Sequence, residues 1–222
     1  MTVVFYKKID FSSMNNTLYI DKFVFWTENE VEKIPDISFI PAMLRRRMNT
    51  IEKTAVALAS KIAPANNDYR IVFASRFGEW GQTIKLIQQF YNEKEVSPAG
   101  FSNSVHNAAM GYLSLLTHNK NSYTSIAAGI KTIENAFLNA ITSDKPVLFI
   151  NAEEKSPKEY EKILGKPVLT HGCAIYLAKG GKNAYELNTN DKNLPPLSFE
   201  QLQDYLENGK DIETSNWKLS KK

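Results

Sequence analysis

The sequence lacks the residues on which several protein classes depend. Cys173 is the only cysteine among 222 residues, which excludes an internal disulfide and any zinc site made of cysteine alone. Three histidines leave little material for a metal centre. No apolar run approaches the roughly 18–20 residues that cross a bilayer, and the N-terminus carries charge too early for a signal peptide. We therefore expect a cytoplasmic protein with no membrane span, no metal and no cofactor.

An excess of charge of one sign is also missing. Lys and Arg number 27 against 24 Asp and Glu, and a net charge of +3 is too small to predict nucleic-acid binding. Apolar residues make up 43% and charged residues 23%, as in an average soluble domain. We expect a single domain over 1–222, with its core at about 17–188 and a frayed tail at about 208–222.

Strand and helix patterns alternate along the chain. Short apolar runs predict strands over 17–26, 71–75, 122–126, 147–151, 173–178 and 185–187. Apolar residues at helical spacing predict helices over 41–62, 79–91, 102–117, 130–141 and 198–206, the last with Ser198 as N-cap and Gln201 three residues on. This order predicts an α/β fold in which helices flank a mixed, mainly parallel sheet.

The most informative unit is the strand ending at Ile126, the turn Ala127-Ala128-Gly129 and the helix that follows. Such a turn often presents a nucleophile at a helix N-terminus, where backbone N–H groups can hold an oxyanion. None of the side chains available here can attack a carbonyl. The sequence therefore predicts a corner suited to a nucleophile that has no nucleophile.

Three segments carry a family resemblance: SPAGFSNSVHNAAMGYLSL (97–115), YTSIAAG (123–129) and DKPVLFINAEE (144–154). Together they resemble the N-terminal half of a β-ketoacyl synthase, an enzyme of the thiolase fold. In that family the strand ends in the catalytic cysteine and a glycine follows three residues later. Gly129 therefore places Ile126 at the cysteine position.

The resemblance covers about 17–180, so we expect no counterpart of the C-terminal half, which carries the family's two catalytic histidines. Family members without the cysteine are chain-length factors, which pair with an active ketosynthase. Short versions similar to this one are associated with aryl polyene and related polyene pigments. The resemblance thus implies a catalytically inactive subunit that forms a heterodimer with a full-length β-ketoacyl synthase and meets acyl carrier protein only indirectly.

The resemblance also implies which residues meet the partner. The strand Tyr123, Thr124, Ser125 and Ile126 would pair antiparallel with its counterpart, and the small residues Ala108, Ala109 and Gly111 would let a helix pack closely across the interface. Gly100, Phe101, Val105 and Met110 would bound the acyl tunnel, with ordinary core packing as the alternative for the last three.

Three arginines follow Leu44 in the predicted helix 41–62. At 100° per residue, Arg46 falls on the solvent side and Arg47 at the edge of the apolar stripe. We expect Arg47 to be partly buried and paired with a carboxylate or carbonyls. Arg45 and Arg46 are candidates for contact with an acidic acyl carrier protein, against a merely solvated face.

Two other functions stay open. One is a small acyltransferase or hydrolase with an unrecognised nucleophile, such as Cys173 or a serine. The apolar run around Cys173 instead predicts a buried, inert thiol. The other is a stand-alone module that binds acyl carrier protein.

Overall fold

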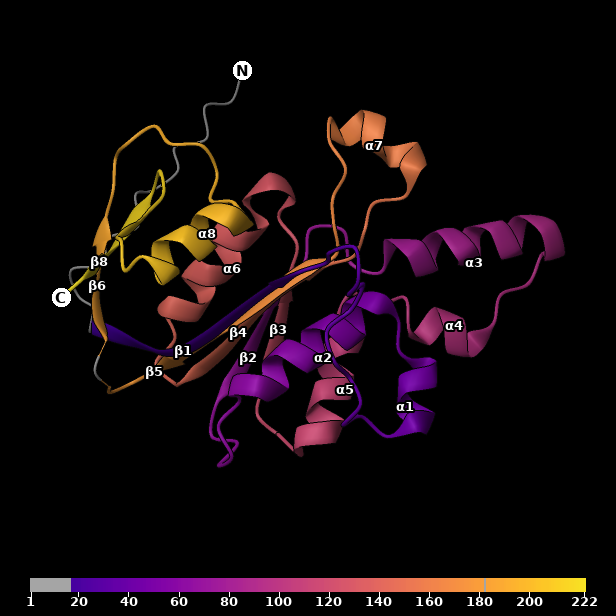
Figure 1. The fold of residues 1–222 in the computed structure, drawn as a ribbon, viewed down its shortest axis with the longest axis horizontal. Coiled ribbons are helices and arrows are strands. Elements are labelled where there is room, and N and C mark those ends of the chain that lie inside the picture. Colours follow the sequence, from indigo (N-terminus) through magenta and orange to yellow (C-terminus); the bar gives the residue numbers. More distant parts are fainter. Residues whose placement is uncertain (1–16, 182) are drawn as a thin grey trace, which may run out of the picture.

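The computed structural model describes residues 17–181 and 183–222, which form one eight-stranded sheet flanked by helices (Figure 1). The strand order is β3-β2-β4-β5-β1-β6-β8-β7. The strands are β1 (Thr17–Thr27), β2 (Arg70–Ala74), β3 (Tyr123–Ile126), β4 (Val147–Glu153), β5 (His171–Ala178), β6 (Ala184–Thr189), β7 (Ile212–Glu213) and β8 (Trp217–Lys221). The helices are α1 (Ala42–Arg47), α2 (Thr50–Ile62), α3 (Trp80–Glu93), α4 (Pro98–Ser102), α5 (Ala108–Thr117), the 3₁₀ turn η1 (Gly129–Lys131), α6 (Thr132–Ile141), α7 (Lys158–Leu164) and α8 (Phe199–Glu207).

The sheet is mixed, as the alternation of elements predicts, but it is not mainly parallel. Strand β2 pairs in parallel with β3 and β4, whereas the other five pairings are antiparallel. The reason is long-range: β1 and β5 pair with each other, although most of the described chain separates them. The carboxyl ends of the parallel strands β3, β2 and β4 lie side by side at one end of the sheet. The candidate site lies at this end.

Helices cover both faces of the sheet. On one face α2 and α5 pack against Leu148 and Ile150, and on the other α6 and α8 pack against Val147 and Phe149. Strand β4 is therefore buried along its whole length, as its continuous apolar run indicates. Figure 1 shows α6 and α8 on the opposite side of the sheet from α2 and α5.

The C-terminal residues are not frayed. Strand β8 pairs with β6 and β7, and Trp217 is only 1% exposed, with its ring 6.1 Å from that of Phe137. Helix α8 begins at the predicted N-cap, where Ser198 and Gln201 form a capping box. The tail folds because it completes the core beside α6, which the sheet alone leaves uncovered.

The predicted helix 41–62 is broken at Met48, whose backbone is extended. Asn49 starts α2 with a capping box, in which its own N–H donates to the Glu52 carboxylate at 2.6 Å. The three arginines consequently lie in the last turn of α1, where cations complement the helix dipole. The predicted helix 102–117 is shorter than expected, because Ser102 is the last residue of α4 and α5 begins only at Ala108.

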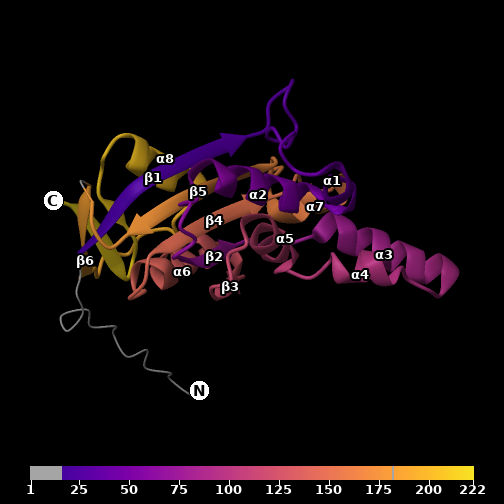
Figure 2. The ribbon, with the colours of Figure 1, turned by 90° about the horizontal axis from the view of Figure 1, so that it is seen from below.

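Helices α3 and α4 project from one end of the sheet and its flanking helices (Figure 2). We call residues 79–104, which contain both helices, the arm. Within the described residues, no helix is long and apolar enough to cross a bilayer.

Candidate functional site

The strand-to-helix corner lies where the sequence predicts it. Strand β3 ends at Ile126, and Gly129 adopts a left-handed backbone with φ +58°, which turns the chain into η1 and α6. The Thr132 hydroxyl accepts the Ala128 N–H at 2.9 Å and donates to the Gly129 carbonyl at 2.7 Å. A backbone donor that could serve an oxyanion is therefore already occupied.

Ile126 presents a hydrocarbon at this corner. Its side chain is half-buried and packs against the core that α6 shares with the sheet. The neighbouring Ala127 and Ala128 are exposed and carry only methyl groups. The corner thus has the geometry of a nucleophile site and no side chain that can react.

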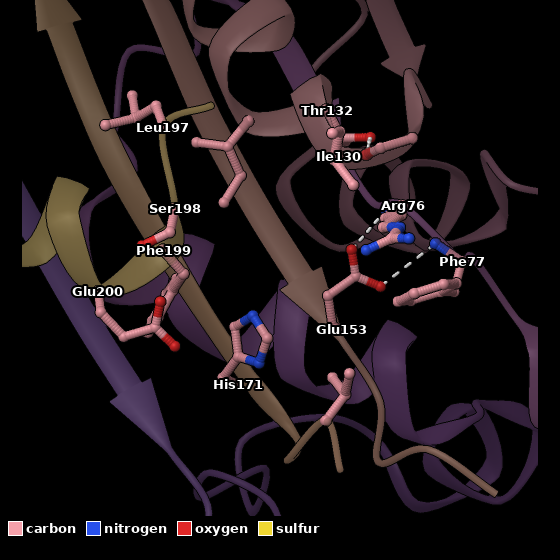
Figure 3. A pocket seen from close by; sticks show the side chains of 13 residues that line it. Arg76, Phe77, Ile130, Thr132, Glu153, His171, Leu197, Ser198, Phe199 and Glu200 are labelled. Atoms are coloured by element: carbon pink, nitrogen blue, oxygen red, sulfur yellow. Dashed lines mark hydrogen bonds between the residues drawn. The ribbon is translucent and has the colours of Figure 1, made fainter. Parts of the chain in front are cut away.

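A cavity of about 180 Å³ lies beside the corner (Figure 3). Its wall combines the start of α6 with Glu153 at the end of β4, His171 at the start of β5, and the segment Leu197–Glu200 that enters α8. The apolar part of the lining comes from Ile130, Ile133, Val168, Leu197, Phe77 and Phe199. The C-terminal segment therefore closes the cavity as well as the core.

Glu153 ties the ends of β2 and β4 together. Its carboxylate accepts from the Ser75 hydroxyl at 3.0 Å and from the backbone N–H groups of Arg76 and Phe77. Burial raises the pKa of Glu153 to about 7, although these hydrogen bonds act in the opposite direction. Figure 3 shows the carboxylate directed at the β2 turn, so Glu153 holds the edge of the cavity in place.

His171 is a polar side chain of the cavity that keeps one ring nitrogen for a further hydrogen bond. Its Nδ1 donates to the Leu169 carbonyl at 2.8 Å, and its ring lies 4.4 Å from that of Phe199. Burial lowers the pKa of His171, which favours the neutral ring with Nε2 as an acceptor. In Figure 3 the ring lies between Glu153 and Glu200. This imidazole has no thiol in the cavity lining to activate, and the Ser198 hydroxyl in that lining accepts the Gln201 N–H.

Cys173 does not fit the role of an unrecognised nucleophile. It is fully buried in β5, and burial raises the pKa of its thiol to about 12. Its place is in the core, as the apolar run around it predicts. Among the residues that the structure describes, no group of three or more His, Cys, Asp or Glu side chains could hold a metal ion.

Strand β3 is one of the two edge strands of the sheet, the other being β7, and its outer side is unpaired within the described residues. The carbonyls of Ser122 and Ile126 accept N–H groups of Ile71 and Ser75, so these alternate residues of the strand face β2. The backbone groups of Tyr123 and Ser125 consequently point away from the sheet. Tyr123 is exposed, and Thr124, Ser125 and Ile126 are half-buried.

The predicted interface residues of α5 do not all reach the surface. Gly111 is exposed with open space around it, and Ala108 is half-buried. Ala109 and Met110 are fully buried against α2, so their assignment to the interface and to the tunnel is wrong. Helical spacing does not reveal which face of α5 meets α2.

The predicted tunnel residues are divided in the same way. Phe101 and Val105 are exposed. A side chain at Gly100 would meet Gln82 and Leu86 of α3, and the Gly100 carbonyl accepts from the Gln82 amide at 3.3 Å. Gly100 therefore allows α3 and α4 to pack closely and does not line an open channel.

Arg45 is half-buried, whereas Arg46 and Arg47 are exposed. The expectation of a partly buried Arg47 is wrong because the helix ends there instead of continuing along the core. Arg45 and Arg46 line a shallow depression together with Lys53, a cation that the helical spacing of seven residues from Arg46 could have indicated.

Comparison with known proteins agrees with this geometry. The family model described as β-ketoacyl synthase, N-terminal domain, matches residues 23–218. No curated protein sequence gives a significant match.

Two solved structures have a similar fold. One is a chain from the complex of the ketosynthase ApeO with its chain length factor ApeC from Xenorhabdus doucetiae, with 20% identity, a TM-score of 0.73 and coverage of 92% of this chain and 99% of that chain. The other comes from AntDE:AntF, a type II polyketide synthase acyl-carrier protein in complex with its ketosynthase, with 15% identity, a TM-score of 0.60 and coverage of 81% and 71%.

Proposed function

Because this chain belongs to the family of β-ketoacyl synthase N-terminal domains, we propose that it is a non-catalytic, chain-length-factor-like subunit. It pairs with a full-length β-ketoacyl synthase and shapes that enzyme's acyl tunnel in type II, fatty-acid-like polyene biosynthesis. The observation that carries the proposal is Ile126, a hydrocarbon at the end of β3 where the family resemblance expects the nucleophilic cysteine.

The chemistry then belongs to the partner. Its cysteine takes the acyl chain, and loss of CO₂ from a malonyl-carrier protein supplies the carbanion that attacks the thioester. In this chain Ile126 offers no thiolate, and Thr132 occupies the Ala128 N–H. The buried, weakly acidic Cys173 gives no substitute.

Pairing uses the free edge of β3. The outward backbone groups of Tyr123 and Ser125 add to a partner strand, which satisfies hydrogen-bonding groups that an isolated edge leaves to water. The exposed Gly111 lies one helical turn after Asn107, whose amide donates to the Tyr123 hydroxyl, and it gives room for close approach. The short chain that matches over 99% of its length comes from a ketosynthase–chain length factor complex, which supports a paired role for a chain of this size.

Chain-length control follows from apolar contact. Phe101 and Val105 are exposed in the isolated chain. On pairing, their side chains form part of the wall of the partner's acyl tunnel. Each buried CH₂ of an acyl chain contributes roughly 0.8 kcal/mol, so a bulky wall at a given depth disfavours any longer product.

The test is reconstitution with a full-length β-ketoacyl synthase from the same genome and malonyl-loaded carrier protein. We expect this chain alone to show no condensation and no labelling by an acyl-thioester probe. We expect the pair to make products of defined length that the ketosynthase alone does not make. Condensation by this chain alone, or an identical product profile with and without it, would contradict the proposal.

The second candidate is a stand-alone module for acyl carrier protein, and one observation favours it. Arg45, Arg46 and Lys53 place three cations around a surface depression, and an acidic carrier protein would complement them. This module would bind carrier protein without any ketosynthase, and Arg46→Glu would weaken that binding. The subunit proposed above needs the ketosynthase for its effect.

A further inference from the structure

Helix α3 of the arm has an apolar stripe that packs against the body at Trp80 and is uncovered in the outer turns of the helix. At 100° per residue, Ile84, Ile87 and Tyr91 fall within about 60° of one another. Leu86, the one buried residue of α3, lies about 100° from Ile87 and packs toward Gly100 of α4. The outer turns of the helix therefore leave Ile87 and Tyr91 open, while Ile84, nearer the body, is half-buried.

The exposure of this stripe is large. Ile87 is 62% exposed and Tyr91 is 77% exposed, and Phe90 beside them is 58% exposed. We call Ile84, Ile87, Phe90 and Tyr91 the outer face of α3. Apolar residues at helical spacing normally turn inward, so an outward stripe of large side chains indicates a surface that another protein covers.

The arm is held firmly enough to present this face. The Glu154 carboxylate accepts the Gly81 N–H in the first turn of α3 at 2.7 Å. At the far end of the arm, the Asn103 amide donates to the Arg47 carbonyl at 2.8 Å, and the Tyr112 hydroxyl donates to Asn103 Oδ1 at 3.3 Å. Both ends of the arm are thus fixed to the body, which lowers the entropy lost when a partner docks.

The short length of the edge strand indicates which protein covers the outer face of α3. Strand β3 has four residues, so the edge that it offers to a partner strand is only about 13 Å long. A stable interface buries roughly 800 Å² of surface on each partner. Strand pairing alone is too small for a lasting heterodimer. Further apolar surface must join it.

The arm is continuous with the edge strand. The Asn107 amide, in the loop that follows the arm, donates to the Tyr123 hydroxyl at the start of β3 at 3.3 Å. Exposed Val105 and Phe101 lie between that contact and α3 along the chain. A partner seated on β3 therefore finds exposed apolar side chains in the segment that leads along the chain from this edge to the arm.

We propose that the outer face of α3 is a second docking surface for the full-length ketosynthase that pairs with β3. This inference rests on the proposed function for the identity of the partner. It adds contacts made by Ile84, Ile87, Phe90 and Tyr91, which are separate from strand pairing and from the tunnel wall. The ketosynthase contributes an apolar patch to this face, because the stripe presents hydrocarbon and aromatic surface to its occupant.

The experiment compares two variants of the whole chain for binding to a full-length ketosynthase from the same genome. Ile87→Ser with Tyr91→Ser removes the centre of the outer face. Val31→Ser is the matched control, since Val31 is 90% exposed in the loop after β1, outside the proposed surface. Both variants change exposed side chains, so circular dichroism and thermal unfolding should match the wild type.

We expect the double variant to raise the Kd about 30-fold or more and the control to leave it unchanged. A Kd of the double variant equal to that of the wild type overturns the inference while leaving the proposed function intact. No binding by the wild type at any concentration overturns the proposed function itself. Self-association of the wild type that the double variant abolishes also overturns the inference, because the face then serves a second copy of this chain.

Discussion

A proline at position 125 separates pairing with a partner from folding of the chain. Ser125 directs its N–H away from β2, toward the free edge, because Ser122 and Ile126 in the alternate positions bond to β2. Ser125→Pro removes an outward donor and no hydrogen bond within the sheet. Edge strands tolerate proline at such positions, so the free energy of unfolding of the isolated chain should change by about 1 kcal/mol or less.

The effect on the complex should be much larger. The lost hydrogen bond costs about 0.5–1.5 kcal/mol, and the partner's unpaired carbonyl costs about 1–3 kcal/mol more. Together these raise the Kd for the ketosynthase by roughly 10-fold to 1,500-fold. Isothermal titration calorimetry measures the Kd, and urea unfolding measures the stability of the variant alone.

Thr124→Pro is the internal control for this reasoning. Thr124 lies between the outward positions and faces β2, so its replacement should destabilise the isolated chain. A Kd for Ser125→Pro within threefold of the wild type would refute strand pairing at β3. Equal destabilisation by both prolines would refute the assignment of inward and outward positions.

Four further predictions concern other parts of the chain. Ile126→Cys should give no condensation by this chain alone, because the family's two catalytic histidines belong to the other half of a full-length ketosynthase; turnover by the purified variant would contradict the account. Phe101→Ala should lengthen or broaden the products of the reconstituted pair, and an unchanged product profile by mass spectrometry would remove Phe101 from the tunnel. Trp217→Ala should lower the free energy of unfolding by about 3–5 kcal/mol in urea, whereas a frayed tail predicts almost no loss. Burial raises the pKa of Glu79 from 4.5 to about 9, so the folded state binds the extra proton and loses stability as pH rises between those values. Glu79→Gln should therefore gain about 3 kcal/mol at pH 7 and almost nothing at pH 4.5, and an equal gain at both pH values would exclude ionisation as the cause.

The corner was predictable because its signals are local. A β-branched and aromatic run, two alanines and Gly129 specify strand, turn and helix within twenty residues, and the structure confirms that Ile126 ends β3. The division of the first helix also has a local signal, the Asn49-to-Glu52 capping spacing. The apolar period continues through Met48, however, and conceals it.

The remaining errors come from contacts between distant segments. Nothing near β1 indicates that it pairs with β5 and β6, and this pairing makes the sheet mostly antiparallel. The alternation of Trp217 and Leu219 with polar residues is a strand signal, but it becomes meaningful only when α6 and β6 provide a surface to cover. Ala109 and Gly111 differ in burial because α2 lies on one side of α5, which no single-helix pattern reveals.

The most direct test of the central claim is the mass of the complex formed when this chain is co-expressed with a full-length ketosynthase from the same genome. Native mass spectrometry of the purified material should show one copy of each chain in a single species, and Ile126→Cys should leave that mass assignment unchanged. Ketosynthase found only with itself, while this chain elutes alone, would contradict the account.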